Sequence, residues 1–191
     1  MTASNIISRI TISLLAVLLL LTPASARNHT VFDVKSASTQ LQGAVYFLNA
    51  VFEISLPPYI LNAFDQGFDL PLAMEVEVFE HNTYWLDKKI VSIKQKYKLQ
   101  YHTLLDTVSV LNVNAGSVHY YSTLKEALNG LSVVLNYPLL DNNALNSGER
   151  YSARLRIGID ETELPIPLKT SALWESNWNL MSDWLEWDIN P

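Results

Sequence analysis

The chain contains no cysteine, and this absence removes several kinds of stabilisation and chemistry. Disulfide bonds, zinc–thiolate sites, cysteine nucleophiles and lipid attachment through a thiol all need a side chain that the protein lacks. Glycine is also scarce, with 6 in 191 residues, and no glycine-rich phosphate loop is present. Stability must therefore come from side-chain packing.

Positive charge is limited as well. The chain has 13 Lys and Arg residues against 19 Asp and Glu residues, which gives a net charge of −6. Nucleic acids bind to proteins that have a basic surface or a strong basic patch, and anionic lipid head groups attract the same kind of surface. The charge balance therefore argues against nucleic acid and against electrostatic adhesion to a membrane.

Long hydrophobic runs are absent except near the N-terminus. There, Arg9 is followed by an apolar run from Ile10 to Leu21 and then by the small residues Ala24 and Ala26. This order is typical of a cleaved export signal, and the run is shorter than the roughly 20 residues that span a bilayer. We expect residues 1–26 to be a signal peptide, the mature chain to lie in the periplasm, and no stable membrane insertion after cleavage.

Catalytic and metal-binding motifs are missing too. The four histidines show neither the i, i+4 spacing of a helical metal site nor the H-x-H spacing of a strand site, and Ser117 does not lie in a G-x-S-x-G turn. We therefore expect no enzyme activity, no metal and no cofactor. A hydrolase with a dispersed carboxylate–histidine site around Glu80, His81 and Asp87 stays open as an alternative.

Alternation of apolar and polar residues is the strongest positive signal. It runs through residues 70–78, 89–101 and 150–159, and each of these segments is typical of a β-strand with one buried and one exposed face. In the last segment Leu155 belongs to the apolar set and Arg154 to the polar set. Residues 42–54 are apolar on both faces, which indicates a strand covered on both sides. Further short strands are expected at residues 31–37, 107–113 and 118–121.

Two short helices are expected between the strands. Pro57 and Pro58 open one of them, and Thr123 with Glu126 makes a capping box at the start of the other. Many antiparallel strands with two short helices predict a mainly β fold, an antiparallel β-sandwich-like single domain over residues 27–170.

The C-terminal tail, residues 171–191, contains four of the five tryptophans. Its apolar residues are spaced i, i+4, i+7 and i+11, which predicts an amphipathic helix over residues 172–187. The polar face of that helix is acidic, which disfavours a membrane surface. The tail therefore offers a candidate partner surface, formed by Trp174, Trp178, Met181 and Trp184. The competing interpretation, which we favour, is that the tail packs on its own domain.

Two of the polar strand faces are basic. Together they form a candidate stripe for an anionic ligand, made of Lys94, Lys96, Lys98, Arg150, Arg154 and Arg156. The simpler interpretation, which we favour, is a solvated outer face whose charges pair across strands. A hairpin of residues 74–79 and 91–99 would place Glu77 opposite Lys94 and Glu75 opposite Lys96.

Four phrases occur in order along the chain: Leu99-x-Tyr101-His102-x-Leu104, Tyr121-x-Thr123-Leu124-x-Glu126-Ala127-Leu128, Tyr151-x-Ala153-x-x-Arg156 and Leu164-Pro165-x-Pro167-Leu168. With the Trp-containing C-terminus, this ordered set resembles the DUF4390 family of exported proteobacterial proteins. The resemblance spans nearly the whole mature chain and implies an envelope protein with no established activity. Genes of this family often neighbour membrane sensor kinases of the nitrogen-regulation type, so the resemblance also implies an accessory role in signalling.

Three functions stay open at this point. The one we favour is a non-catalytic exported domain that binds an envelope or inner-membrane protein, such as a sensor kinase. The second is a carrier of a small ligand or lipid, with a cavity lined by Tyr46, Phe52, Tyr59 and Phe64. The third is the hydrolase described above.

Overall fold

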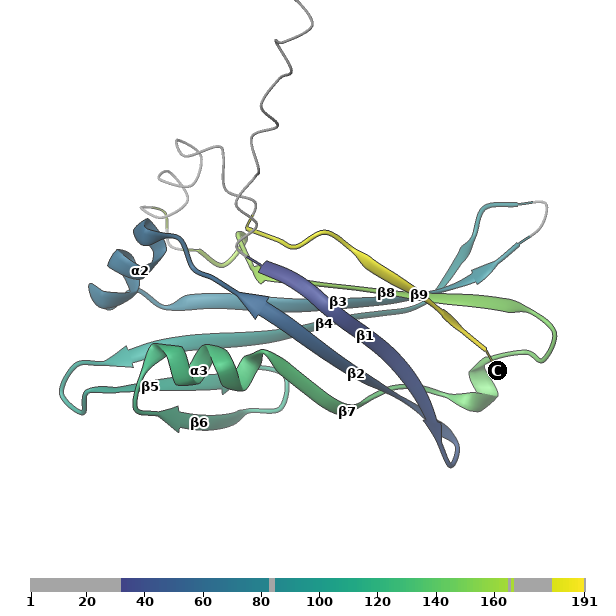
Figure 1. Ribbon diagram of the computed structural model, residues 1–191, viewed down its shortest axis with the longest axis horizontal. Helices are drawn as coiled ribbons and strands as arrows, with labels where there is room; N and C mark the ends of the chain where they lie inside the picture. Colours follow the sequence, from purple (N-terminus) through teal and green to yellow (C-terminus); the bar gives the residue numbers. More distant parts are fainter. Residues whose placement is uncertain (1–31, 83–84, 165, 167–179, 191) are drawn as a thin grey trace, which may run out of the picture.

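The computed structural model describes residues 32–82, 85–164, 166 and 180–190, and its architecture is mainly β (Figure 1). Two antiparallel sheets pack against each other and two short helices accompany them, which confirms the predicted fold class. The predicted signal peptide lies outside the described residues. Among the residues described, no helix is both long and apolar enough to cross a bilayer.

The larger sheet has six strands in the order β6-β5-β4-β3-β8-β9. Their bounds are β3 (Leu70–His81), β4 (Lys88–His102), β5 (Thr107–Asn112), β6 (Ser117–Tyr121), β8 (Arg150–Ile159) and β9 (Leu185–Ile189). The three segments with regular alternation form its centre, because β4, β3 and β8 are neighbours. Regular alternation favours this place because one face of the sheet packs on the core and the other meets solvent.

The smaller sheet has three strands in the order β1-β2-β7, with β1 at Phe32–Gln42, β2 at Val45–Ile54 and β7 at Val133–Asp141. β2 is covered on one side only, and not on both as predicted, because Val51 and Glu53 are exposed while alternate residues are buried. β7 was not predicted. Pro138 interrupts it and its register with β2 shifts twice, so no regular alternation marks it in the sequence.

Both helices begin near the predicted residues. α2 spans Pro58–Asp65 and α3 spans Leu124–Leu131, and a short 3-10 turn, η1, follows β7 at Asn142–Ala144. The capping box of α3 is present: Glu126 N–H donates to Thr123 Oγ1 at 3.1 Å, and Ser122 N–H donates to a Glu126 carboxylate oxygen at 3.1 Å.

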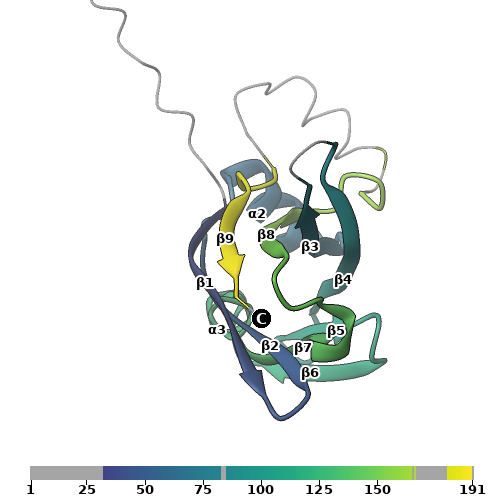
Figure 2. The ribbon, with the colours of Figure 1, turned by 90° about the vertical axis from the view of Figure 1, so that its right-hand side faces the viewer.

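The hydrophobic core lies between the two sheets (Figure 2). Leu155 of β8 is fully buried, as predicted, and stands opposite Val76 of β3. Hydrogen bonds also join the sheets at their flanks. Trp187 Nε1 of β9 donates to Thr39 Oγ1 of β1 at 3.3 Å, and the Tyr137 hydroxyl of β7 is 3.4 Å from Gln95 Oε1 of β4.

The predicted C-terminal helix is not found in the described part of the tail. Leu185–Ile189 forms β9, which pairs with β8 from Leu155↔Leu185 to Tyr151↔Ile189. Apolar and acidic residues alternate along this segment, which is a strand pattern that competes with the helical spacing. Residues 172–179 of the predicted helix lie outside the described residues.

The β3–β4 hairpin has a register two residues away from the predicted one. Glu75 stands opposite Lys94, and Glu77 stands opposite Ser92. Parity along the strands fixes which face a side chain occupies but not the offset between strands, and the pairing also shifts between Val78 and Phe79. Both carboxylates still lie on the outer face.

Candidate functional site

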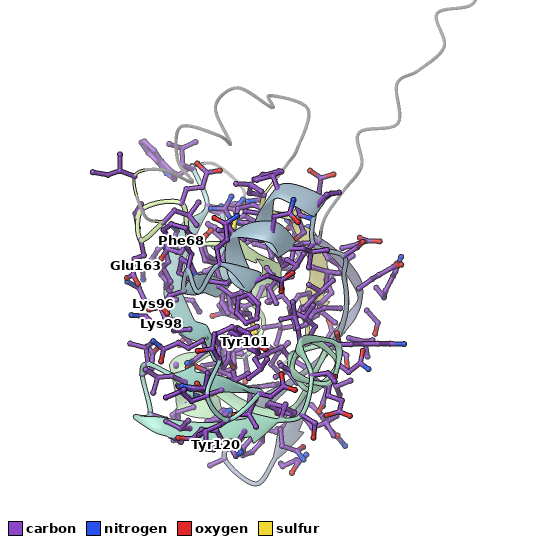
Figure 3. The ribbon with its side chains drawn as sticks, turned by 90° about the vertical axis from the view of Figure 1, so that its left-hand side faces the viewer. Phe68, Lys96, Lys98, Tyr101, Tyr120 and Glu163 are labelled. Carbon is purple, nitrogen blue, oxygen red and sulfur yellow. The ribbon has the colours of Figure 1, made fainter. Side chains whose placement is uncertain are left out.

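Most of the predicted basic stripe and one tail tryptophan meet on the outer face of the six-stranded sheet. We call this surface the charged face, and it is formed by Glu75, Glu77, Lys94, Lys96, Lys98, Arg154 and Arg156. Figure 3 shows Lys96, Lys98 and Glu163 together on this flank. Each of the five cations forms an ion pair with a carboxylate, so the stripe is not an unpaired basic surface.

Glu77 is the centre of the first ion cluster. Its carboxylate accepts hydrogen bonds from Arg154 Nη2 at 2.5 Å and from Lys89 Nζ at 2.5 Å. Burial alone would raise the pKa of the Glu77 carboxyl, but the hydrogen bonds from Lys89 and Arg154 outweigh burial, and this pKa is lowered. The Glu77–Arg154 pair joins β3 to β8, whose residues stand directly opposite each other here.

Glu75 and Asp160 form the second cluster. Glu75 Oε2 lies 2.6 Å from Arg156 Nη2, and Asp160 Oδ2 lies 3.0 Å from Lys94 Nζ. Asp160 is buried, which would raise its carboxyl pKa, but hydrogen bonds from Thr162 and Lys94 outweigh burial and the pKa is lowered. The pKa of Lys94 would be lowered by burial and is instead raised, because Asp160 and Glu75 stabilise the ammonium form.

The remaining basic residues of the stripe are less constrained. Lys96 pairs with Glu163 and lies 3.9 Å from Asp160, and Lys98 lies 3.7 Å from Asp69. These partly exposed pairs contribute little to stability, since solvent screens them. Arg150 is separated from the other five and lines a cleft at the far end of β8.

Trp184 packs on two members of the predicted stripe. The guanidinium carbons of Arg154 and Arg156 each lie 4.4 Å from its ring centroid, and Arg154 also lies 4.7 Å from the ring of Phe79. Cations in such positions are attracted by the aromatic ring. Arg154 therefore lies between two rings and a carboxylate, and Trp184 covers the edge of the charged face.

Met181 also contacts the domain. It forms an isolated β-bridge with Gly158, and a Cβ on Gly158 would lie 2.6 Å from Met181 Sδ. Gly158 is needed at this position because the tail approaches β8 so closely. Of the predicted partner surface, Met181 and Trp184 thus belong to the folded domain, while Trp174 and Trp178 lie outside the described residues.

The carboxylate–histidine group of the hydrolase hypothesis is only partly assembled. His81 Nδ1 lies 2.8 Å from Asp87 Oδ2, and this hydrogen bond lowers the pKa of the Asp87 carboxyl. Glu80 instead faces Lys88. The His81–Asp87 pair lines a cleft of about 300 Å³ with Arg150.

Within residues 32–82, 85–164, 166 and 180–190, no three His, Asp or Glu side chains are placed to hold a metal ion. A serine–histidine contact that the sequence did not predict joins His102 Nε2 to Ser109 Oγ at 2.8 Å. Ser109 is buried, and the His102 ring packs 6.1 Å from that of Tyr120. A nucleophile in this position would be shielded from a substrate.

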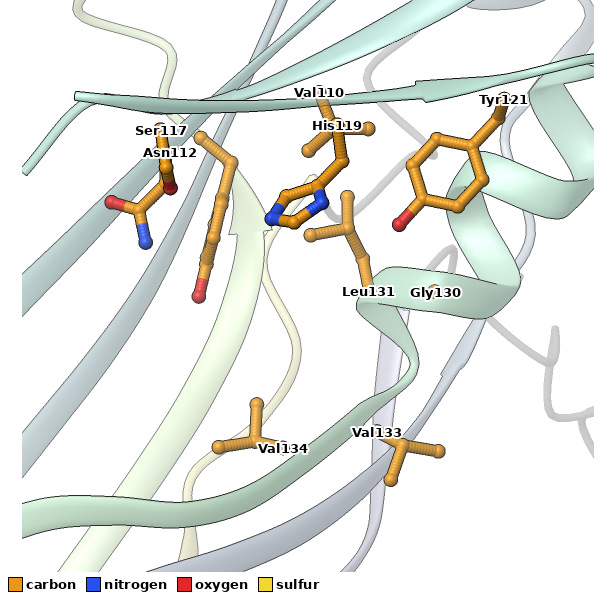
Figure 4. Close-up of a pocket in the computed structure, with 10 residues that line it drawn as sticks. Val110, Asn112, Ser117, His119, Tyr121, Gly130, Leu131, Val133 and Val134 are labelled. Carbon is orange, nitrogen blue, oxygen red and sulfur yellow. The ribbon is translucent and has the colours of Figure 1, made fainter. Parts of the chain in front are cut away.

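The residues of the proposed carrier cavity lie in or against the main core. Tyr46, Phe52 and Phe64 are buried, and Tyr59 is half-buried against them. A different pocket, of about 230 Å³, lies between the β5–β6 hairpin, the end of α3 and the start of β7. Figure 4 shows His119 and Tyr121 pointing into it from β6.

This pocket under α3 is mixed in character. Val110, Leu131 and Val134 supply apolar walls, Asn112 and Ser117 supply polar groups, and no Asp, Glu, Lys or Arg lines it. Gly130 has a packing role here, because a Cβ on it would lie 2.5 Å from the Tyr121 hydroxyl.

A region with few charges surrounds the pocket, and it was not predicted as a functional surface. Between Asp106 and Asp141 the only Asp, Glu, Lys or Arg residues are Lys125 and Glu126. This stretch supplies β5, β6, α3 and nearly all of β7, and it lies beside β2, which is uncharged up to Glu53. The scarcity of charged residues between Asp106 and Asp141 could have identified this region from the sequence.

Part of this region is an exposed sheet surface, which we call the neutral face. It consists of five apolar residues on the outer side of β2 and β7, Val45, Phe47, Val51, Val133 and Leu135. Asn49 and the exposed Glu53 lie on the same side of β2. Val51, Val133 and Leu135 are exposed, and Val51 stands directly opposite Val133. Apolar side chains gathered on one solvent-facing sheet are typical of an interaction surface.

Comparison with known proteins assigns the chain to a family. No curated protein matches the chain, and no solved structure matches it. The sequence profile described as "Domain of unknown function (DUF4390)" matches residues 30–188, which includes every described strand except Ile189, the last residue of β9. The family that the four ordered phrases indicated is therefore the right one, and the chain belongs to the DUF4390 family.

Proposed function

We propose that this protein is exported to the periplasm and acts there as a non-catalytic domain that binds an envelope protein through its neutral face. The observation that carries the proposal is the contrast between two sheet surfaces. The cations of the charged face are paired within the chain, whereas Val51, Val133 and Leu135 are exposed to solvent.

The chemistry of the partner follows from the charge pattern. The chain is acidic overall, yet β2 is uncharged up to Glu53 and β7 is uncharged up to Asp141. A partner with a basic surface would gain nothing on the neutral face, whereas an uncharged apolar surface would bury these side chains without desolvating a charge. The partner we propose is a membrane sensor kinase with such a surface on its periplasmic side.

Export can be tested directly on the native protein. We expect mass spectrometry to find a mature N-terminus at Arg27, because Ala24 and Ala26 match the small residues that signal peptidase requires. A native chain that still begins at Met1 would refute the localisation.

Partner binding is tested with substitutions on the neutral face and a matched control. Val133→Glu and Leu135→Glu place a carboxylate on the neutral face, and Leu86→Glu places one on a more exposed apolar residue outside it. Affinity purification from envelope extracts should recover the same partner with the wild-type and Leu86→Glu proteins. Both neutral-face variants should lose it while keeping the wild-type melting temperature. Equal recovery by all four proteins would contradict the proposal.

The pocket under α3 supports a second candidate function, binding of a small uncharged ligand. A cavity of about 150 Å³ is enough for one benzene ring, and this pocket measures about 230 Å³. Phenol is a suitable probe, because the pocket combines apolar walls with the polar groups of Asn112 and His119. Saturable shifts in the amide NMR signals of Val110 and Gly130, with Leu86 unaffected, would support this candidate, and their absence would remove it.

A further inference from the structure

β6 is an open edge of the six-stranded sheet. It pairs with β5 on one side only, and four of its five residues are exposed. Figure 3 shows Tyr120 of this strand at the bottom of the view, below Lys96 and Lys98. An open edge presents unpaired backbone N–H and C=O groups, to which another strand can add.

The other edge strands of the described sheets carry features that block such pairing. β1 has a bulge between Val34 and Ser36, with Lys35 at that position. β7 contains Pro138 and pairs irregularly with β2. β9 carries Glu186 and Asp188. Charges, prolines and bulges are the devices by which natural sheets protect their edges.

β6 has none of these protections. Its sequence, Ser117–Tyr121, contains no Asp, Glu, Lys, Arg or Pro, and its register with β5 runs from Val108↔Tyr121 to Asn112↔Ser117 without a shift. A regular, uncharged and exposed edge in a chain that protects its other edges indicates that this edge is used.

We propose that the mature chain forms a symmetric dimer in which β6 pairs antiparallel with β6 of a second copy, so that the two six-stranded sheets become continuous. The two-fold axis passes through His119. This register pairs all five residues, with His119 opposite its counterpart and Ser117 opposite Tyr121 of the second copy.

The sequence of β6 favours a second copy over an unrelated strand. In this register both outward-facing pairs are Val118 with Tyr120, one pair on each side of the axis. A β-branched residue opposite an aromatic one is a favourable cross-strand pair. Two acidic chains can also approach most readily through the region where neither has charges.

The size of the contact sets the expected affinity. A pair of five-residue strands buries less than the roughly 1,000 Å² of a typical stable interface, so the dimer should dissociate on dilution. The proposal does not depend on partner binding at the neutral face, because that surface lies on β2 and β7. Either one can therefore fail without the other.

Since the chain lacks cysteine, a single introduced thiol tests both the dimer and its register. At His119 two thiols would face each other, within the about 4.4–6.8 Å between Cα atoms that a disulfide allows. At Val118 the two thiols would be diagonal neighbours, about 7–8 Å apart, which is too far. We expect the His119→Cys protein to form a disulfide-linked dimer on mild oxidation with diamide at least tenfold faster than the Val118→Cys protein.

Analytical ultracentrifugation provides an independent measurement on chains without thiols. Tyr120 is 66% exposed on β6 and Leu135 is 69% exposed on β7, so they form a matched pair. We expect Tyr120→Lys to shift the wild-type monomer–dimer equilibrium to monomer and Leu135→Lys to leave it unchanged. Equal rates of cross-linking at positions 118 and 119, or a wild-type chain that stays monomeric at millimolar concentration, would overturn the proposal.

Discussion

The charged face and the neutral face are both outer sheet surfaces, and they differ in where their side chains find partners. On the charged face, Glu77 bonds to Arg154 and Lys89, and Glu75 pairs with Arg156 and Lys94. On the neutral face, apolar side chains meet solvent. The cations of the first surface are paired within one chain, whereas Val51, Val133 and Leu135 of the second are exposed.

A basic stripe would ordinarily be considered first as the site for an anionic ligand. Here the cations of the charged face are already paired within the chain. Lys94 of β4 and Arg154 and Arg156 of β8 are held in ion clusters, and Trp184 on the segment leading to β9 covers the two arginines. Surface that is already paired and covered offers little to a partner. We therefore propose that the region with few charges is the one used for association.

The largest expected effect compares two leucines. Leu155 is fully buried on β8 and Leu135 is exposed on the neutral face. Leu155→Ala should cost about 2–5 kcal/mol of unfolding free energy, as large-to-small core changes do. Leu135→Ala should stay within about 0.5 kcal/mol. Urea denaturation measures both, and equal costs would mean that the burial assigned to these strands is wrong.

The second prediction concerns arginines on the same strand. From the sequence alone, Arg154→Ala is expected to be nearly neutral because Arg154 lies on the polar face. The structure raises that expectation to about 1.5–3 kcal/mol, since the change removes hydrogen bonds to a charged, mostly buried carboxylate and two aromatic contacts. Arg150→Ala is the control and should cost about 0.5 kcal/mol or less. Equal losses for the two variants would show that the Glu77 cluster contributes nothing.

The third prediction uses acid. The pKa values of the Glu77 and Asp160 carboxyls are lowered in the folded chain, so the unfolded chain binds protons more readily as pH falls. Their contribution to stability is therefore present above the unfolded pKa values, near about 4, and is lost as pH falls through the lower folded values. Melting temperatures measured between neutral and acid pH should fall less steeply for Glu77→Gln than for the wild type. Parallel curves would contradict the assignment.

The smallest stability effect is expected on the neutral face. Val51→Lys should change the unfolding free energy by about 0.5 kcal/mol or less, because the side chain is exposed and the lysine can extend into solvent. It should nevertheless abolish recovery of the envelope partner. A large loss of stability would instead show that this face is packed within the native chain.

The sequence predicted the central strands well because their alternation is regular. β3, β4 and β8 each have one face on the core, and this face requires apolar residues at alternate positions. The capping box of α3 could also be predicted from the sequence, because Thr123 and Glu126 act through local hydrogen bonds.

Features that depend on contacts between residues distant in the sequence were harder to predict from the sequence. β7 carries Pro138 and register shifts, so its strand identity depends on pairing with β2. The tail residues 185–189 fit both a helical and a strand pattern. They form a strand in the fold because they pair with the edge of β8. The role of Arg154 depends on Phe79 and Trp184, which are distant in sequence and adjacent only in the fold.

Site-specific photo-cross-linking in the native envelope tests most directly whether the neutral face binds a partner. Benzoylphenylalanine placed at Leu135 on the neutral face is compared with the same group at Lys98 on the charged face. We expect one discrete adduct with an envelope protein from position 135, repeated from position 133, and none from position 98. Adducts from position 98 with none from positions 133 and 135 would contradict it.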